Sequence, residues 1–236
     1  MRVNKLENCI INGVPKIQRL YNKVSDGWWL YHAPESFIQS HLALHIAHNG
    51  EFCVYPECSP KRWKASVSRG NGTKPRGRPF SAHNKKRFDL VIWRKSGKRP
   101  RAIVEIKRAV YASPLVEDAG KIVDYGKEAQ FFGIRTAYIL AYSEARQNGK
   151  KAPRHSGTKK LEQRFKAWSE NLREECGDKA TVKCVGWEAH EPRDQDDKPK
   201  WSWGVALYRL DYRAKKKKTK RVVCRSPAVM RTRKAA

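Results

Sequence analysis

The sequence predicts an α/β fold in which helices flank a sheet of buried strands. Residues 88–93 and 102–106 are almost wholly apolar and rich in β-branched side chains, which is typical of strands buried on both faces. Residues 159–176 repeat apolar side chains at helical spacing and therefore predict an amphipathic helix. With 236 residues, of which 39% are hydrophobic, the chain can bury one substantial core.

The remaining core elements can be assigned in chain order. A proline opens the first turn of a helix expected at 34–47, and 51–55 is the first expected strand. The turn signal Ser96-Gly97-Lys98 joins the two apolar runs into a hairpin. A second helix at 114–132 and a strand at 136–142 complete this part of the chain.

The C-terminal part of the chain is expected to extend the sheet or to cover one of its faces. A polar stretch at 144–158 predicts a linker to the amphipathic helix, and strands are expected at 181–187 and 201–210. The domain organisation that we expect is an N-terminal segment, a core with a basic inserted loop, a C-terminal extension packed on the core and a basic tail, over residues 1–33, 34–143 with 59–87 inserted, 144–212 and 213–236.

Three ionisable residues lie at or inside the ends of the hairpin strands. Glu105 and Lys107 are two positions apart and point to the same face of a strand, and Asp89 comes level with them when the hairpin closes. Buried charges are costly unless they are paired or bind a metal. Two carboxylates can hold Mg²⁺, and a lysine beside the ion can orient or deprotonate a water or stabilise the transition state. The pattern therefore favours metal-assisted phosphodiester hydrolysis over a structural Glu–Lys pair at a strand edge.

The spacing of these residues resembles a known signature. Asp89, followed after sixteen residues by Glu105-Ile106-Lys107, is similar to the motif of the PD-(D/E)XK nuclease superfamily, with Phe88 where the literal motif has proline. The resemblance covers residues 34–143 and implies a restriction-endonuclease-like mixed β-sheet core in the order αβββαβ. Helices would flank this core, and a C-terminal helix and strand extension would follow it. The resemblance also implies a metal-dependent nuclease.

The resemblance implies a role for individual residues of that core. The metal ligands are expected to be Asp89, Glu105, the Ile106 carbonyl and Glu35, with Mg²⁺ as the ion and Mn²⁺ as its substitute. Lys107 would position or activate the attacking water and would complete the catalytic set of Glu35, Asp89 and Glu105. Gln130, late in the second helix, matches a polar position that lies near the site in some members and is expected to support it.

The net charge indicates a nucleic-acid partner. The chain carries 51 Lys and Arg against 23 Asp and Glu, for a formal net charge of +28. Residues 59–87 contain ten basic side chains and 213–236 contain eleven, and neither segment contains an acidic one. Without these 21 side chains the balance is 30 against 23, or +7. Two cationic segments on a mildly basic body predict tight, salt-sensitive binding to phosphates.

The first cationic segment contains a minor-groove motif. Lys74-Pro75-Arg76-Gly77-Arg78-Pro79 resembles the AT-hook, in which proline favours extended backbone and Gly77 lets the chain approach the groove floor. Arg76 and Arg78 then reach along a narrow, negative A·T-rich groove. The alternative is a Gly/Pro/Arg-rich loop with general affinity only. The DNA-binding residues that we expect are Lys74, Arg76, Gly77, Arg78, Lys85, Lys86 and Arg87.

These observations predict a Mg²⁺-dependent endonuclease that hydrolyses phosphodiester bonds in double-stranded DNA, with a bias to A·T-rich sites. Double-strand cleavage with one site per protomer makes a homodimer plausible. The polar N-terminus and the absence of a long apolar stretch predict no membrane partner and a cytoplasmic, nucleoid-associated protein, or a nuclear one in a eukaryote. The alternatives are a non-catalytic DNA-binding or architectural protein on a nuclease-like fold, and an RNA-binding protein with a basic tail.

Overall fold

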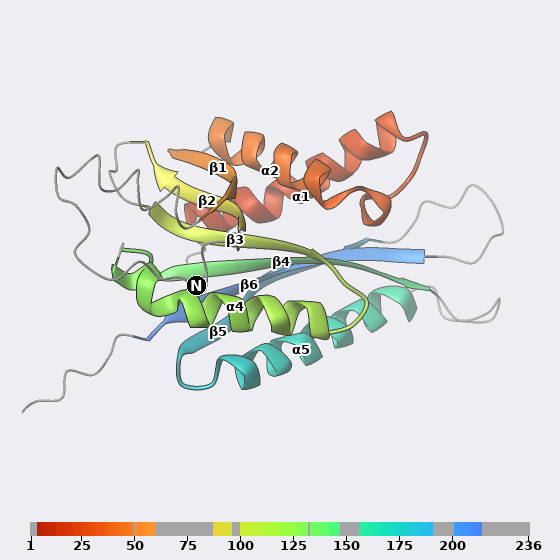
Figure 1. Ribbon diagram of the computed structural model, residues 1–236. Helices are drawn as coiled ribbons and strands as arrows, with labels where there is room; N and C mark the ends of the chain where they lie inside the picture. The colour runs from red at the N-terminus through yellow and green to blue at the C-terminus, as the bar shows by residue number, and fades with distance from the viewer. Residues whose placement is uncertain are drawn as a thin grey trace, which may run out of the picture.

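The computed structural model describes residues 4–49, 51–59, 87–95, 100–131, 133–146, 156–190 and 201–213. In these ranges the chain forms a mixed six-stranded sheet with helices on both faces, which confirms the α/β class (Figure 1). None of the helices within the described ranges is long and apolar enough to cross a membrane.

Helices open the chain, a run of three strands follows them, and two further helices are each followed by strands. The helices are α1 (Lys5–Val24), the short 3₁₀ helix η1 (Leu30–His32), α2 (Glu35–Asn49), α4 (Ser113–Phe131) and α5 (Ser156–Cys176). The strands are β1 (Phe52–Cys58), β2 (Phe88–Arg94), β3 (Pro100–Arg108), β4 (Thr136–Arg146), β5 (Ala180–His190) and β6 (Trp201–Tyr212). Their order across the sheet is β1-β2-β3-β4-β6-β5.

The pairing of the strands explains where the helices lie. β2 is antiparallel to both β1 and β3, and β6 is antiparallel to both β4 and β5. β3 and β4 are parallel, so a tight turn cannot join them, and α4 provides the crossover. α1 and α2 cover one face of the sheet, while α4 and α5 cover the other (Figure 1).

Two hydrophobic clusters, one on each face of the sheet, hold these layers together. Leu42 of α2 packs in one cluster with Leu90 and Val104. Ile103 packs in the other cluster with Phe165 of α5. Because Val104 and Ile103 are neighbours that belong to opposite clusters, β3 buries both of its faces, and its sequence is an almost unbroken apolar run.

The helices and strands expected after residue 33 all have counterparts within the described ranges, with ends that differ by at most four residues. The linker prediction at 144–158 is wrong at both ends. β4 continues to Arg146 because β6 pairs with it over its whole length, and α5 already begins at Ser156. The hairpin is present as the antiparallel pair β2 and β3, while its turn at 96–98 lies outside the described residues.

The N-terminal segment 1–33 contains α1, for which the sequence analysis expected no element. The Asn4 side chain caps this helix by accepting from the Leu6 amide at 3.3 Å, and the Glu7 carboxylate accepts from the Asn4 amide at 3.0 Å. Ile10 then packs in the same cluster as α2. The segment is therefore part of the layer that covers one face of the sheet.

Candidate active site

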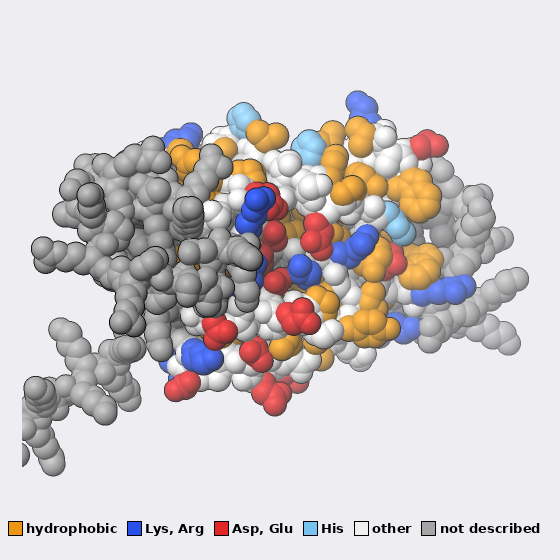
Figure 2. Space-filling model, viewed as in Figure 1, with side chains coloured by type: hydrophobic (Ala, Val, Ile, Leu, Met, Phe, Trp, Pro, Cys, Tyr) orange, Lys and Arg blue, Asp and Glu red, His pale blue; other side chains and the backbone are white. Residues whose placement is uncertain are grey.

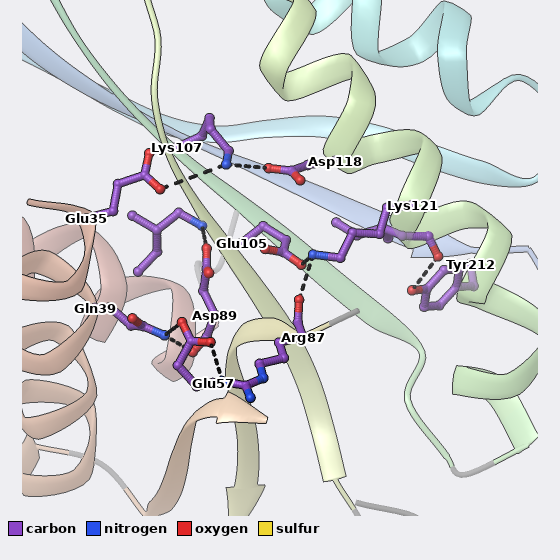
Figure 3. A network of polar contacts seen from close by, with 12 residues as sticks. Glu35, Gln39, Glu57, Arg87, Asp89, Glu105, Lys107, Asp118, Lys121 and Tyr212 are labelled. Atoms are coloured by element: carbon purple, nitrogen blue, oxygen red, sulfur yellow. Dashed lines mark hydrogen bonds and ion pairs between the residues drawn. The ribbon is translucent and has the colours of Figure 1, made fainter. Parts of the chain in front are cut away.

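The predicted site residues lie where β2 and β3 stop pairing. Leu90 pairs with Val104, so Asp89 and Glu105 are the next opposed residues along the hairpin. The Oδ2 atom of Asp89 accepts a hydrogen bond from the Ile106 amide at 2.6 Å, beyond the last backbone pair (Figure 3). The structure thus brings the aspartate beside the Glu-Ile-Lys segment of β3.

Glu105 is a carboxylate inside the protein, with only 2% of its surface exposed. Its Oε1 atom accepts from Lys121 Nζ at 2.5 Å, and the same Nζ donates to the Arg87 carbonyl at 2.7 Å. Burial raises the pKa of Glu105 well above its usual range, the neighbouring Asp89 raises it further, and Lys121 opposes the rise. Burial also raises the pKa of Asp89, although the Ile106 amide opposes it. Two carboxylates that repel each other in a poorly hydrated place favour a bound cation.

Lys107 lies between helices that cover opposite faces of the sheet. Its Nζ is 3.4 Å from Asp118 Oδ2 on α4 and 3.9 Å from Glu35 Oε2 on α2 (Figure 3). Burial lowers the pKa of Lys107, but the carboxylates of Asp118, Glu35 and Asp89 more than offset this effect, so that the pKa is raised. At neutral pH the side chain is therefore a fixed ammonium that donates hydrogen bonds and cannot take up a proton.

Two site residues on α4, Asp118 and Lys121, were missed by the sequence analysis. They are three positions apart and so share a face of the helix. Burial raises the pKa of Asp118, and the ammonium groups of Lys107 and Lys121 oppose the rise. Apart from the ion pair with Lys107, the buried Oδ2 atom of Asp118 has no hydrogen-bond partner among the described residues. The sequence contained one indication of these two residues, because each charged side chain directly precedes an apolar residue that is buried, namely Ala119 and Ile122.

α2 holds the opening between β2 and β3 in place. Glu35 Oε1 accepts from the Arg108 amide at 3.3 Å, at the edge of β3. Gln39, one turn further along the helix, donates from Nε2 to the Asp89 carbonyl at 2.7 Å and to Glu57 Oε1 at 3.1 Å. Gln39 could not be predicted from the sequence, because its partner is a backbone carbonyl 50 residues away. These bonds tie one helix to three strands at the site.

The charges in this cluster suit one divalent cation. Four carboxylates and two lysines give a formal charge of −2 when all are ionised, from Glu35, Asp89, Glu105 and Asp118 against Lys107 and Lys121. Mg²⁺ takes oxygen ligands and is commonly bound through one or two carboxylates together with waters. Over the described chain, no group of three or more His, Cys, Asp or Glu side chains is arranged to hold a metal by itself. The residues present fit a Mg²⁺ ion held by Asp89, Glu105 and the Ile106 carbonyl and completed by water.

Most of the predicted DNA-binding residues fall outside the described ranges, namely Lys74, Arg76, Gly77, Arg78, Lys85 and Lys86. Arg87 is described and lies immediately before β2, where its exposed guanidinium has Nη1 3.7 Å from Glu57 Oε2. Gln130 belongs to α4, but its side chain is also outside the described part of the chain. Of this set, the structure places only Arg87 beside the site.

No relative of this chain was found among known proteins. The chain matches no protein-family model, no curated protein and no solved structure. Any function proposed for the chain therefore depends on the geometry of the site and on the distribution of charge.

Proposed function

We propose that the protein is a Mg²⁺-dependent endonuclease that hydrolyses phosphodiester bonds in double-stranded DNA. The observation that carries the proposal is the carboxylate pair of half-buried Asp89 and buried Glu105, which lie opposite each other at the end of the β2/β3 pairing with Lys107 beyond them. The order α2, β1, β2, β3, α4, β4 supports a restriction-endonuclease-like core. The formal net charge of +28 supports a nucleic-acid substrate.

The carboxylates have a binding role in this proposal. Asp89 and Glu105, with the Ile106 carbonyl, would hold the ion, and Glu35 would support its water shell or a second ion. Mg²⁺ supplies an activated water and neutralises the charge that grows on the phosphate. Glu35 already orders two groups at the mouth of the site, because one of its oxygens accepts from the Arg108 amide and the other faces Lys107.

Lys107 has two candidate roles on sequence grounds, namely to deprotonate the attacking water or to orient it. The raised pKa favours the second role, because an ammonium beside three carboxylates has no free lone pair to accept a proton. Its hydrogen bonds can orient a water and stabilise negative charge on a phosphate oxygen. Asp118 and Glu35, on either side of it, hold the ammonium in place.

Cationic groups would hold the DNA. Arg87 is exposed directly before β2 and belongs to the basic segment 59–87, which supplies ten cations, while 213–236 supplies eleven. Such groups bind phosphates without regard to sequence. Arg76 and Arg78 add a preference for A·T-rich minor grooves, where negative potential is strongest.

Plasmid nicking, with Mg²⁺ or with a chelator, tests the proposal. Asp89→Asn, Glu105→Gln and Lys107→Ala are each expected to slow nicking by about 100-fold or more, since each removes a group that acts on the reacting atoms. The matched controls are Glu162→Gln and Lys166→Ala, which remove an exposed ion pair on α5 and should cut normally. Nicking by the three site variants at the wild-type rate, or undiminished nicking in chelator, would contradict the proposal.

One observation favours the alternative of a non-catalytic DNA-binding protein. Glu105 has a partner in Lys121 and Asp89 has one in the Ile106 amide, so each carboxylate is already bonded by the protein itself. A purely structural network has this form. It predicts binding to DNA with no cleavage at any Mg²⁺ concentration, and the same plasmid assay distinguishes the two functions.

A further inference from the structure

A group of exposed aromatic side chains lies next to the candidate active site. Trp28, in the connection between α1 and α2, is 57% exposed, and Tyr111, in the loop between β3 and α4, is 75% exposed. Figure 2 shows hydrophobic and histidine side chains gathered beside the acidic and basic cluster on one face of the molecule. Among the described residues these are the two most exposed side chains of Trp, Tyr or Phe.

Successive side chains connect Trp28 to the site. The Trp28 ring meets His32 edge to face with centroids 4.9 Å apart, and His32 meets Tyr31 in the same way at 5.6 Å. The Arg108 guanidinium lies over the Tyr31 ring at 5.5 Å, and its Nη1 atom donates to the Tyr31 carbonyl at 3.2 Å. We call Trp28, Tyr31, His32, Arg108 and Tyr111 the aromatic shelf.

The aromatic shelf ends at the proposed catalytic residues. The Arg108 amide donates to Glu35, and the other carboxylate oxygen of Glu35 faces Lys107. Tyr111 follows Arg108 by three residues, in the loop that leaves the end of β3 toward α4. A ligand on the shelf would therefore lie within reach of a phosphate at the site.

Trp28 follows the end of α1. The Gly27 amide donates to the Asn22 carbonyl at 2.8 Å, and Asp26 and Gly27 adopt left-handed φ values of 55° and 92°, which is a common way for a helix to end. Core packing in this connection is done by Leu30 and Ala33, each 1% exposed, so that Trp28 is not needed for it. The Trp28 ring therefore lies in solvent although the packing of the core does not require it.

Resting on the proposed function, we propose that the aromatic shelf stacks unpaired bases of the DNA strand next to the phosphodiester that is cut. Bases inside a continuous duplex are already stacked on their neighbours and cannot reach these rings. Unpaired bases can, and aromatic rings interleaved with arginine are the groups that bind them. The preferred substrate is then DNA with unpaired nucleotides at the cut, such as a fork, flap or bulge, and not uninterrupted duplex.

Binding in chelator tests this proposal without any contribution from cleavage. Fluorescence anisotropy of the full-length protein would compare a labelled forked DNA with a continuous duplex of equal length and salt. The wild type is expected to bind the fork about tenfold more tightly, as stacking of one or two bases implies. Trp28→Ala and Tyr111→Ala should each remove most of this preference and leave binding to the duplex unchanged, whereas Trp28→Phe should retain it.

Matched controls are aromatic residues that are exposed elsewhere on the molecule. Trp187 on β5 is 40% exposed and Tyr55 on β1 is 47% exposed, and neither belongs to the aromatic shelf. Trp187→Ala and Tyr55→Ala should keep the preference for the fork. Thermal unfolding of every variant separates a loss of stacking from a loss of folding.

Several outcomes would overturn the inference. One is equal affinity of the wild type for fork and duplex, and another is unchanged fork binding by both Trp28→Ala and Tyr111→Ala. A third is that these variants dissociate a wild-type dimer in sedimentation without weakening fork binding, which would make the shelf a contact between copies. A fork preference in a protein that cleaves neither plasmid nor the forked DNA in Mg²⁺ would contradict the nuclease proposal and leave the shelf standing.

Discussion

At the scale of single residues, the buried carboxylate of Glu105 lowers the stability of the folded protein. The side chain is almost fully buried beside Asp89, and its pKa is raised by burial and by that neighbouring carboxylate. Proteins commonly accept such a cost where a charge is needed for function. A purely structural position would be filled more stably by a neutral side chain.

Glu105→Gln is expected to abolish nicking and to stabilise the protein in chelator. Because the folded pKa of Glu105 is raised, the unfolded chain releases this proton at a lower pH than the folded chain. The wild type therefore loses stability as pH rises from the ordinary carboxylate range through the folded pKa, and the full penalty is present above it. Thermal unfolding from pH 4 to 8 should show a shallower decline for Glu105→Gln.

At pH 8 each 1 kcal/mol gained by that variant corresponds to about 2–4 °C in Tm for a chain of this size. Glu162→Gln, on the exposed face of α5, is the control and should follow the wild-type curve. Parallel curves for wild type and Glu105→Gln would show that the buried charge carries no such cost.

Asp118→Asn is expected to change the pH dependence of cleavage. Of the three carboxylates that raise the pKa of Lys107, Asp118 has the largest effect. Lys107 should therefore lose its proton at a lower pH in the variant. The alkaline limb of kcat/KM against pH should then fall earlier than in the wild type. Asp124→Asn, an exposed position on the same helix, is the control. An unshifted alkaline limb would show that Asp118 does not raise the pKa of Lys107.

At the scale of elements, the site depends on how closely α4 docks against the sheet. A side chain added at Gly126 would meet the Tyr212 ring at 2.8 Å, and the Tyr212 hydroxyl donates to the Ile122 carbonyl at 3.2 Å. A side chain added at Gly120 would meet Glu175 Oε1 at 2.9 Å, which is the end of a flexible side chain. The first contact is with a half-buried ring that packs against the core, and the second is with a side chain that can move aside.

Gly126→Ala should therefore be less stable than Gly120→Ala by about 1–3 kcal/mol, the usual cost of overpacking. Both changes gain the same helix propensity, so their difference isolates the contact with Tyr212. Gly126→Ala should also nick more slowly, because the shift of α4 displaces Asp118 and Lys121 from β3. Denaturant unfolding and the plasmid assay measure the two effects. Equal stability of the two variants would show that α4 tolerates the displacement.

The same elements show what sequence can and cannot predict. β2 and β3 were predictable because strands covered on both faces have almost wholly apolar sequences, and Asp89, Glu105 and Lys107 stand out in them. α1 was missed although the buried residues Leu6, Ile10 and Val14 follow helical spacing, since Pro15 interrupts the pattern. The helix residues that contact Asp89, Glu105 and Lys107 could not be predicted from such local patterns.

Asp118, Lys121 and Gln39 illustrate that limit. Each is a polar residue on a helix, a position that is normally a solvated surface. They belong to the site because α4 lies over β3 and α2 lies over the start of β2, and these are tertiary placements. A local pattern contains no information about which polar side chain faces the sheet.

At the scale of the whole molecule, charge is concentrated in two segments. Of the 51 basic residues, 21 lie in 59–87 and 213–236, where there is no acidic residue. Each phosphate that a cation neutralises lowers the slope of log Kobs against log salt by about 0.9. Affinity for DNA should therefore depend steeply on salt.

Replacing the four lysines at 215–218 by glutamine should reduce that slope by up to about 3.6, which is four contacts at about 0.9 each. The control replaces four lysines of α5, β5 and their connection, and it should change the slope little. These are Lys159, Lys166, Lys179 and Lys183. Titrations of a labelled duplex over a range of salt concentrations measure both slopes. Equal reductions would show that net charge, and not its placement, sets the affinity.

The most direct test of the central claim is to locate a divalent cation in the protein. We would soak crystals of the full-length chain with Mn²⁺ and record its anomalous scattering. We expect a peak whose ligands include Asp89 and Glu105, and no such peak in Asp89→Asn. A wild-type map with no peak there, and with Lys121 still bound to Glu105, would contradict the claim that these carboxylates form a metal site.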